Sequence, residues 1–129
     1  MKDADAVAEF GALVAGGAEP LDRALALIAT AGRPDVDPDA VIGRIDELAD
    51  MVPAGDSVQM CRGLFTGLGF HGNRTDYYDP DNSRIDRVID RRTGIPITLS
   101  VLAMEIGRRR GVTLLGIGMP GHFLLRDAS

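Results

Sequence analysis

The sequence lacks most of the features that mark secreted, membrane-spanning or nucleotide-binding proteins. Its single cysteine, Cys61, cannot form a disulfide within the chain, so a reducing, cytoplasmic compartment is expected. No apolar run approaches the ~18 residues that a membrane-spanning helix needs. The acidic start Met1-Lys2-Asp3-Ala4-Asp5 is not typical of a secretory signal. A Walker loop, a C-x-x-C pair and a complete G-x-G-x-x-G motif are also missing, and we expect no cofactor.

Aromatic residues are scarce, at 5% of 129 residues with no tryptophan, so Leu, Ile, Val, Ala and Met have to build the core. Apolar residues make up 45% and charged residues 26%, which is ordinary for a single soluble globular domain. The net charge of −5 argues against non-specific binding to nucleic acid. The basic runs Arg108-Arg109-Arg110 and Arg91-Arg92 are therefore interpreted as helix-end charges that pair locally.

Apolar residues at helical spacing predict four helices in the first half of the chain. Each is preceded by residues that cap or begin helices, namely Asp3 or Asp5, Pro20, Asp37-Pro38, and Asp56 or Ser57. The residues expected on the four buried faces are Val7, Phe10, Leu13 and Val14; Leu21, Ala24, Leu25 and Ile28; Val41, Ile42, Ile45, Leu48 and Ala49; and Val58, Cys61, Leu64, Phe65 and Leu68.

The second half of the chain predicts a polar loop, two helices and a hairpin. The expected elements are an ordered loop over 69–83, a short helix with Ile85, Val88 and Ile89 capped by Asn82 or Ser83, a turn over 93–96, a helix from Pro96 to about Arg110 that ends at Gly111, and antiparallel strands over 112–119 and 122–126 around Pro120-Gly121. Because helices come first and strands last, the pattern indicates an α+β fold.

Three blocks of the second half are similar to those of a known family. They are Leu64-Phe65 with Leu68-Gly69-Phe70 and Gly72-Asn73, Tyr77-Tyr78-Asp79-Pro80 with Asn82-Ser83, and 91–100, which runs on to 118–124. Over about residues 56–126 they resemble the SirB-type family of transglutaminase-like proteins. The resemblance implies a helical N-terminal layer, residues 1–53, on a partial transglutaminase-like (papain-like) core, residues 54–129, that ends in the hairpin. That core normally continues to a strand bearing Asp or Asn, so we expect only part of it here.

Active members of this superfold place a cysteine at the start of a helix that packs on a small sheet, and the sheet presents a histidine and then an acid. Active relatives have Gly-x-Cys where this chain has Gly94-Ile95-Pro96, and proline has no nucleophilic atom. His122 is the candidate base, and Ser100, one turn after Pro96, is the candidate substitute nucleophile. The simpler interpretations are a histidine that holds its loop by hydrogen bonds and a small polar residue at a helix–sheet contact.

Other polar residues are expected around this cleft or in the loop before it. The expected cleft residues are Asn73, Tyr77, Tyr78, Asn82, Pro96, Thr98 and Gly121. Side chains of Asn73, Tyr77, Asp79 and Asn82 are expected to bond to the loop backbone. His71, Asp76 and Asp79 match no tetrahedral ligand spacing, so no metal is expected. Cys61 lies among apolar residues and is interpreted as a buried structural thiol.

Functions of different classes remain open. The first is a non-catalytic regulatory or protein-interaction module of a bacterial cytoplasm, which the SirB-type resemblance implies. The second is a hydrolase or acyl-transfer enzyme that uses His122 with an atypical nucleophile such as Ser100. A third is binding of a small ligand in the old cleft without turnover. A protein partner is expected, and the open strand edge also predicts a homodimer through residues 112–126.

Overall fold

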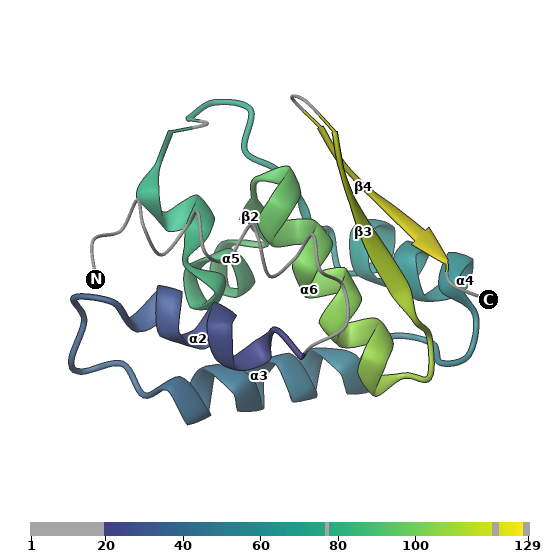
Figure 1. The fold of residues 1–129 in the computed structure, drawn as a ribbon, viewed down its shortest axis with the longest axis horizontal. Coiled ribbons are helices and arrows are strands. Elements are labelled where there is room, and N and C mark those ends of the chain that lie inside the picture. Colours follow the sequence, from purple (N-terminus) through teal and green to yellow (C-terminus); the bar gives the residue numbers. More distant parts are fainter. Residues whose placement is uncertain (1–19, 77, 120–121, 128–129) are drawn as a thin grey trace.

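A computed structural model describes the backbone of residues 20–76, 78–119 and 122–127, with the side chains of these residues up to Leu114. Its elements are α2 (Asp22–Thr30), α3 (Pro38–Asp50), α4 (Ser57–Arg62), the π-helix η1 (Gly63–Gly67), β1 (His71–Gly72), the 3₁₀-helix η2 (Pro80–Ser83), α5 (Ile85–Arg91), β2 (Thr93–Gly94), α6 (Pro96–Arg109), β3 (Leu114–Met119) and β4 (His122–Asp127) (Figure 1). The first predicted helix lies outside the described residues. None of the described helices is long and apolar enough to cross a membrane.

Helix α6 is the central element of a mixed, mainly helical fold. It contacts α3, α4, α5 and both strands of the terminal hairpin. In Figure 1, α2 and α3 lie below α6, and the hairpin lies on its other side. Every residue from Thr98 to Gly107 is buried, so this helix is enclosed all round. Its predicted limits are confirmed, because Pro96 takes the first helical position and Gly111 follows the last turn with a φ of 76°.

The strands form two separate two-stranded sheets. β3 and β4 pair antiparallel, with Leu114 opposite Asp127 and Met119 opposite His122. β1 and β2 pair in parallel, with residues 71–72 opposite residues 93–94. The sequence did not predict this parallel pair, because two-residue strands are too short to show an alternating pattern. It joins the start of the polar loop to the segment directly before α6.

The helices α2 and α3 confirm two predicted helices, with one shift. All four buried residues of α3 were expected. Helix α2, however, begins at Asp22, so Pro20 precedes the helix instead of occupying its first turn. The buried face is turned accordingly, with Ala26 and Ala29 fully buried and Ile28 only partly buried.

The fourth helix departs most from the prediction. Asp56 caps it as expected, and after six residues the chain continues as the π-helix η1. Met60 and Leu64 are the side chains that reach the core, whereas Val58 is 57% exposed and Cys61 is half-buried. The prediction is right for Leu64, which is fully buried, and missed Met60. The predicted residues Cys61, Phe65 and Leu68 only pack partly against the core.

Candidate functional site

The start of α6 is where the resemblance places a nucleophile. Ile95 precedes the helix with extended backbone (φ −107°, ψ 164°), and Pro96 fills the first helical position. The hydroxyl of Thr98, a residue only 3% exposed, accepts a hydrogen bond from the Ile95 N–H at 3.1 Å. It donates one to the backbone carbonyl of Asn82 at 2.8 Å. This backward-reaching half of a capping box fixes the helix start against the loop before it.

The described residues of this first turn carry no reactive side chain. Pro96 has no nucleophilic atom, and the Thr98 hydroxyl is committed to two backbone groups. Ser100, the candidate substitute nucleophile, lies one turn further into the helix and is only 8% exposed. Residues 95–98 therefore offer neither a thiol nor an uncommitted hydroxyl.

The polar loop between β1 and α5 is held by side chains that bond to its backbone. Asn73 accepts hydrogen bonds from the N–H groups of Thr75 and Asp76 at 3.2 and 2.9 Å and donates to the Asn82 side chain at 3.0 Å. Asn82, which is buried, donates to the carbonyl of Asp76 at 3.0 Å. The prediction that Asn73 and Asn82 tie down this loop is confirmed. Tyr77, predicted to do the same, lies outside the described residues.

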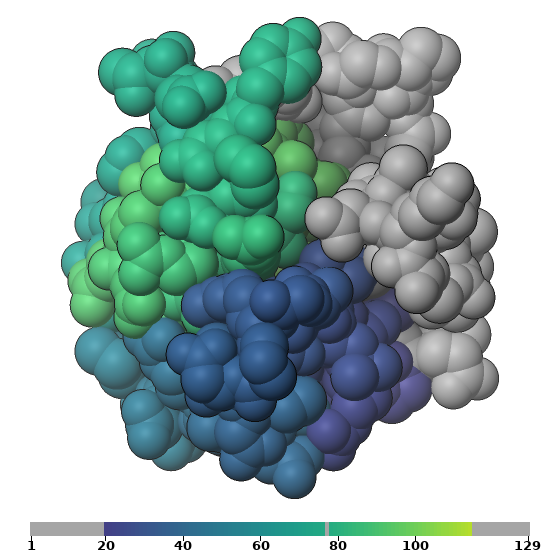
Figure 2. Space-filling view, turned by 90° about the vertical axis from the view of Figure 1, so that its left-hand side faces the viewer, coloured from purple at the N-terminus to yellow at the C-terminus, as the bar shows by residue number. Residues whose placement is uncertain are grey.

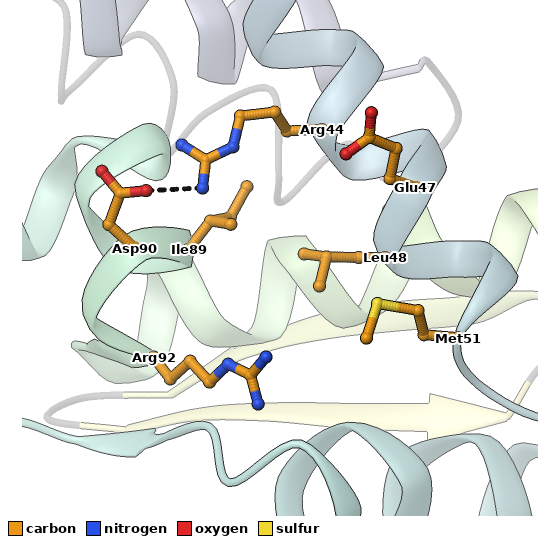
Figure 3. Close-up of a pocket in the computed structure, with 7 residues that line it drawn as sticks. All are labelled: Arg44, Glu47, Leu48, Met51, Ile89, Asp90 and Arg92. Carbon is orange, nitrogen blue, oxygen red and sulfur yellow. Dashed lines mark hydrogen bonds and ion pairs between the residues drawn. The ribbon is translucent and has the colours of Figure 1, made fainter.

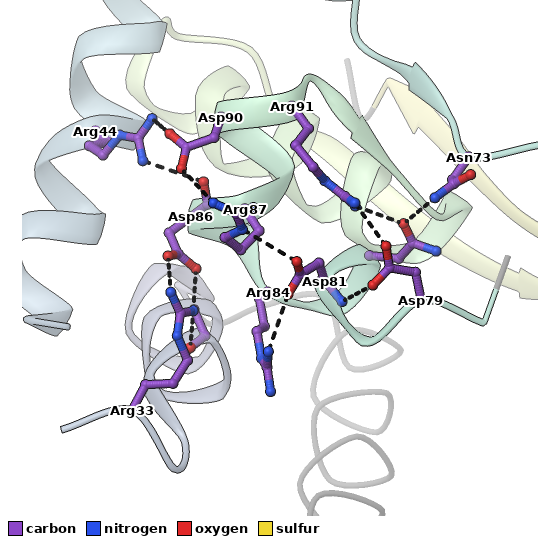
Figure 4. A network of polar contacts seen from close by, with 12 residues as sticks. Arg33, Arg44, Asn73, Asp79, Asp81, Arg84, Asp86, Arg87, Asp90 and Arg91 are labelled. Carbon is purple, nitrogen blue, oxygen red and sulfur yellow. Dashed lines mark hydrogen bonds and ion pairs between the residues drawn. The ribbon is translucent and has the colours of Figure 1, made fainter. Parts of the chain in front are cut away.

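Arg91, in the last turn of α5, binds the same loop (Figure 4). Its guanidinium donates to the carboxylate of Asp79 at 2.9 Å and to the Asn82 side chain at 3.1 Å. The backbone N–H of Asp81, at 2.9 Å, and then the Arg91 guanidinium lower the pKa of Asp79 below its ordinary value. The sequence predicted Asn82 or Ser83 as the cap of α5, but both belong to η2, and Arg84 precedes the helix.

Four of the seven predicted cleft residues meet at this junction. Asn73 bonds to Asn82, Asn82 bonds to Thr98, and Pro96 begins the helix turn that Thr98 stabilises. Tyr78 does not line an enclosed pocket with them, because it is 90% exposed.

The remaining predicted site residues are wholly or partly outside the described structure. Tyr77 and Gly121 are not described, and only the backbone of His122 is, as the first residue of β4. The catalytic hypothesis needs a hydrogen bond between His122 and Ser100, and that bond stays a prediction.

The histidine of the polar loop joins the parallel pair. His71 donates from Nδ1 to the carbonyl of Gly69 at 2.9 Å, and its Nε2 lies 3.2 Å from the Thr93 hydroxyl. Among the described residues, no group of three or more His, Cys, Asp or Glu side chains is placed to hold a metal ion. His71, Asp76 and Asp79 therefore do not converge on a common point.

In the basic run at the end of α6, Arg108 and Arg109 pair with acids, whereas Arg110 donates to the backbone carbonyl of Val52 at 3.2 Å. Glu105, buried within α6, binds Arg108 at 2.7 Å and Arg109 at 3.1 Å. Arg109 also reaches Asp22 at 2.9 Å, and the Leu21 N–H donates to Glu105 at 3.3 Å. These contacts tie α2 to α6. The helix-end pairing predicted for Arg108 and Arg109 is confirmed.

A shallow pocket of about 280 Å³ between α3 and α5 was not predicted (Figure 3). Arg44 crosses it to pair with Asp90 at 2.5 Å, while Met51 and Arg92 line its other end. Arg92 adopts a left-handed φ of 53° and donates to the carbonyl of Leu68 at 2.6 Å. Both arginines of the pocket are thus engaged. On α3, Arg44 and Glu47 were expected to face solvent and Leu48 to face the core, so the sequence carries no signal of a pocket.

An open groove of about 460 Å³ lies beside α4. Val58, Cys61 and Phe65 line it on the helix side, and Leu114 at the start of β3 lines it opposite. Burial raises the pKa of the Cys61 thiol, which keeps the thiol protonated. Cys61 is half-buried and packs against the core, so its thiol is more exposed than the buried structural thiol that the sequence predicted.

Comparisons with known proteins agree with the sequence blocks. The profile of the Transglutaminase-like superfamily matches residues 36–129. The chain is 51% identical over 65 residues to a UPF0162 protein of Xylella fastidiosa, which covers 50% of the chain and 23% of that protein. It is 49% identical over 63 residues to F-box only protein 21 of Homo sapiens, covering 49% of the chain and 10% of that protein.

A more extended match joins the chain to a UPF0162 protein of Pseudomonas aeruginosa, with 30% identity over 107 residues, 77% of the chain and 40% of that protein. The chain spans only about a quarter of the length of the two Xylella relatives, since the match covers 23% of each. No solved structure matches the chain significantly.

Proposed function

Because the chain belongs to the transglutaminase-like superfamily, we propose that it is a non-catalytic member that acts as a regulatory or protein-interaction module. The start of α6 supports this most directly. Pro96 stands where the resemblance places the nucleophilic cysteine, and the Thr98 hydroxyl of the same turn is bonded to two backbone groups. Acyl transfer in this superfold needs a thiolate or an activated substitute at that place.

The polar junction before α6 supports the same proposal. In an active site, preorganised donors point to the place where charge develops on the substrate. Here the polar groups of Asn73, Asn82, Thr98 and Arg91 bond to one another or to backbone. They hold the loop, and among these side chains the buried Nε of Arg91 is the donor that has no partner in the described structure.

The outer side of this fixed loop suits contact with a protein. The loop stands out at the top of the molecule in both views (Figures 1 and 2), and its Tyr78 is 90% exposed. Tyrosine is enriched among the residues that dominate binding energy at protein interfaces. A side chain on a loop that is already ordered loses less conformational entropy on binding. We therefore infer that the loop contributes to binding a protein partner.

The relatives are consistent with a modular role. The similar segment makes up 23% of the Xylella UPF0162 protein and 10% of F-box only protein 21, so it occurs within longer proteins of different lengths. The SirB-type resemblance, whose name comes from regulation, adds a regulatory role in a bacterial cytoplasm to the proposal.

An activity screen of the full chain tests the proposal. The chain is incubated with glutamine peptides and amine acceptors, and separately with amide and ester substrates, beside its His122→Ala variant. We expect no difference between the two proteins. Turnover by the wild type that His122→Ala abolishes would overturn the proposal, and a Ser100→Ala variant would then show whether Ser100 is the nucleophile.

We also propose that the hairpin supports a homodimer through residues 112–126. In the described sheet, β3 and β4 each have one hydrogen-bonded neighbour, so each leaves an open edge. Light scattering coupled to size exclusion is expected to show a mass that rises towards the dimer with concentration. A clean monomer at high concentration contradicts it.

A further inference from the structure

The segment formed by α4 and η1 has two apolar faces, and only one is fully buried in the core. Met60 and Leu64 are fully buried on the inner face. Val58, Cys61 and Phe65, spaced by three and four residues, form a second stripe along the open groove. Cys61 and Phe65 also pack partly against the core, whereas Val58 is 57% exposed, so core packing explains this stripe only in part.

The groove has the size of a small-molecule site. Its volume is about 460 Å³, within the roughly 300–1,000 Å³ typical of ligand pockets. Leu114 closes it on the side of β3, and the π-helix contributes Phe65 and Thr66 to its lining. Single π-helical turns occur frequently at functional sites. Size and lining together favour an elongated apolar ligand.

The polar groups of the groove select the charge of that ligand. Arg62 lines the groove together with the hydroxyl residues Ser57 and Thr66. Within the part of the chain that the structure describes, Arg62 makes no ion pair and no side-chain hydrogen bond. Most other described arginines pair with a carboxylate, as Arg33 does with Asp86. An unpaired cation beside an apolar stripe, in a chain of net charge −5, favours an anionic group on an apolar ligand.

We propose that this groove binds an amphiphilic monocarboxylate, of the class of a medium-chain fatty acid. Its hydrocarbon chain lies along Val58, Cys61 and Phe65, and its carboxylate pairs with Arg62. A nucleotide or other polyphosphate does not fit, because the described lining of the groove is mainly apolar and supplies a single cation, Arg62. The proposal is independent of whether the α6 start is catalytic.

The chain's only cysteine lies in this groove, so its alkylation reports occupancy directly. The rate of Cys61 alkylation by neutral iodoacetamide is measured against increasing decanoate below micelle formation, with decyltrimethylammonium as the matched cation. We expect saturable protection by decanoate and none by the cation. Arg62→Gln is expected to raise the half-saturating concentration about 2- to 5-fold, the range of an exposed ion pair. The exposed Val58→Asp variant is expected to abolish protection.

The matched control is Arg74→Gln, because Arg74 is exposed and lies on the polar loop, outside the groove. It should keep the wild-type half-saturating concentration. Equal protection by decanoate and the cation, or no difference between Arg62→Gln and Arg74→Gln, would overturn anion recognition. A second measurement follows amide NMR shifts during decanoate titration. Shifts centred on residues 57–66 support the site, and the absence of such shifts rules it out.

Discussion

Replacing Thr98 by valine tests whether one hydroxyl fixes the start of α6. The change keeps the branched shape of the side chain and removes only its hydrogen bonds. In the wild type, the Thr98 hydroxyl lies 3.1 Å from the Ile95 N and 2.8 Å from the Asn82 carbonyl oxygen, and Thr98 is only 3% exposed. The valine leaves both backbone groups without this partner. A buried polar group left unsatisfied costs about 1–3 kcal/mol. Since both groups lose their partner, we expect the free energy of unfolding to fall by about 2–3 kcal/mol.

Denaturant unfolding followed by circular dichroism measures this loss as a lower midpoint with an unchanged slope. For a domain of this length the thermal midpoint should fall by about 10 °C. Thr98→Ser is the matched control, because it keeps the hydroxyl and loses one methyl group, at a cost of about 1 kcal/mol. A Thr98→Val protein within about 0.5 kcal/mol of the wild type would refute the reasoning, since the hydroxyl would then not hold the junction.

Two further changes test packing and charge. Gly107→Ala places a Cβ 2.8 Å from the carbonyl oxygen of Val112, so we expect a loss of about 1–3 kcal/mol in denaturant unfolding. Gly43→Ala in α3 is the control, because its Cβ meets nothing within 4 Å, and its free energy of unfolding should rise by up to about 1 kcal/mol. Equal changes in the stability of the two variants would contradict the close packing at Gly107. Burial tends to raise the pKa of Asp86, but hydrogen bonds and charge from Arg33 lower it below its ordinary value of 3.8. A carboxyl group with a lowered folded pKa stabilises the fold above its unfolded pKa, and this stabilisation is lost as the pH falls through the folded value. Asp86→Asn should therefore be less stable at pH 7 and lose less stability below about pH 4, and an identical acid profile would contradict it.

The parts of the fold that the sequence predicted well carry strong local signals. Pro96 and Gly111 bracket α6 because proline suits a first helical turn and glycine tolerates the left-handed backbone after the last one. Asp56 begins α4 for a similarly local reason, since its carboxylate accepts the N–H groups of the first turn. None of these choices depends on the rest of the chain.

The inner face of the α4–η1 segment depends on long-range packing, and the sequence predicted Leu64 there but not Met60. Apolar residues occupy both faces of that segment, and only contact with α6 decides that Met60 enters the core in place of Cys61. The groove beside α4 was missed for the same reason, because its stripe had been assigned to the core. The parallel pairing of residues 71–72 with 93–94 likewise joins segments that no local pattern connects.

In the candidate site, too, the sequence predicted what local signals determine and missed what long-range contacts determine. The sequence predicted Asn73, Asn82 and Thr98 as site residues, because polar residues in a turn-rich loop and at a helix start commonly bond to backbone. It did not predict that Asn82 and Thr98, sixteen residues apart, would bond to each other. Arg91 was interpreted as a helix-end charge, and its partners Asp79 and Asn82 become visible only in the folded chain.

The start of α6 connects the fold to the proposed function through the same atoms. A helix N-terminus offers unpaired N–H groups and the positive end of the helix dipole, and a catalytic thiolate uses both. Pro96 removes one of these donors, and the Thr98 hydroxyl takes up the N–H of Ile95. Groups kept unsatisfied for a substrate destabilise a fold, whereas groups that bond within the protein stabilise it. The Ile95 N–H, the Thr98 hydroxyl and the Asn82 side chain bond within the protein, and the Arg91 Nε is the buried side-chain donor left without a partner in the described structure. This arrangement suits a domain that presents a fixed surface more than one that turns over a substrate.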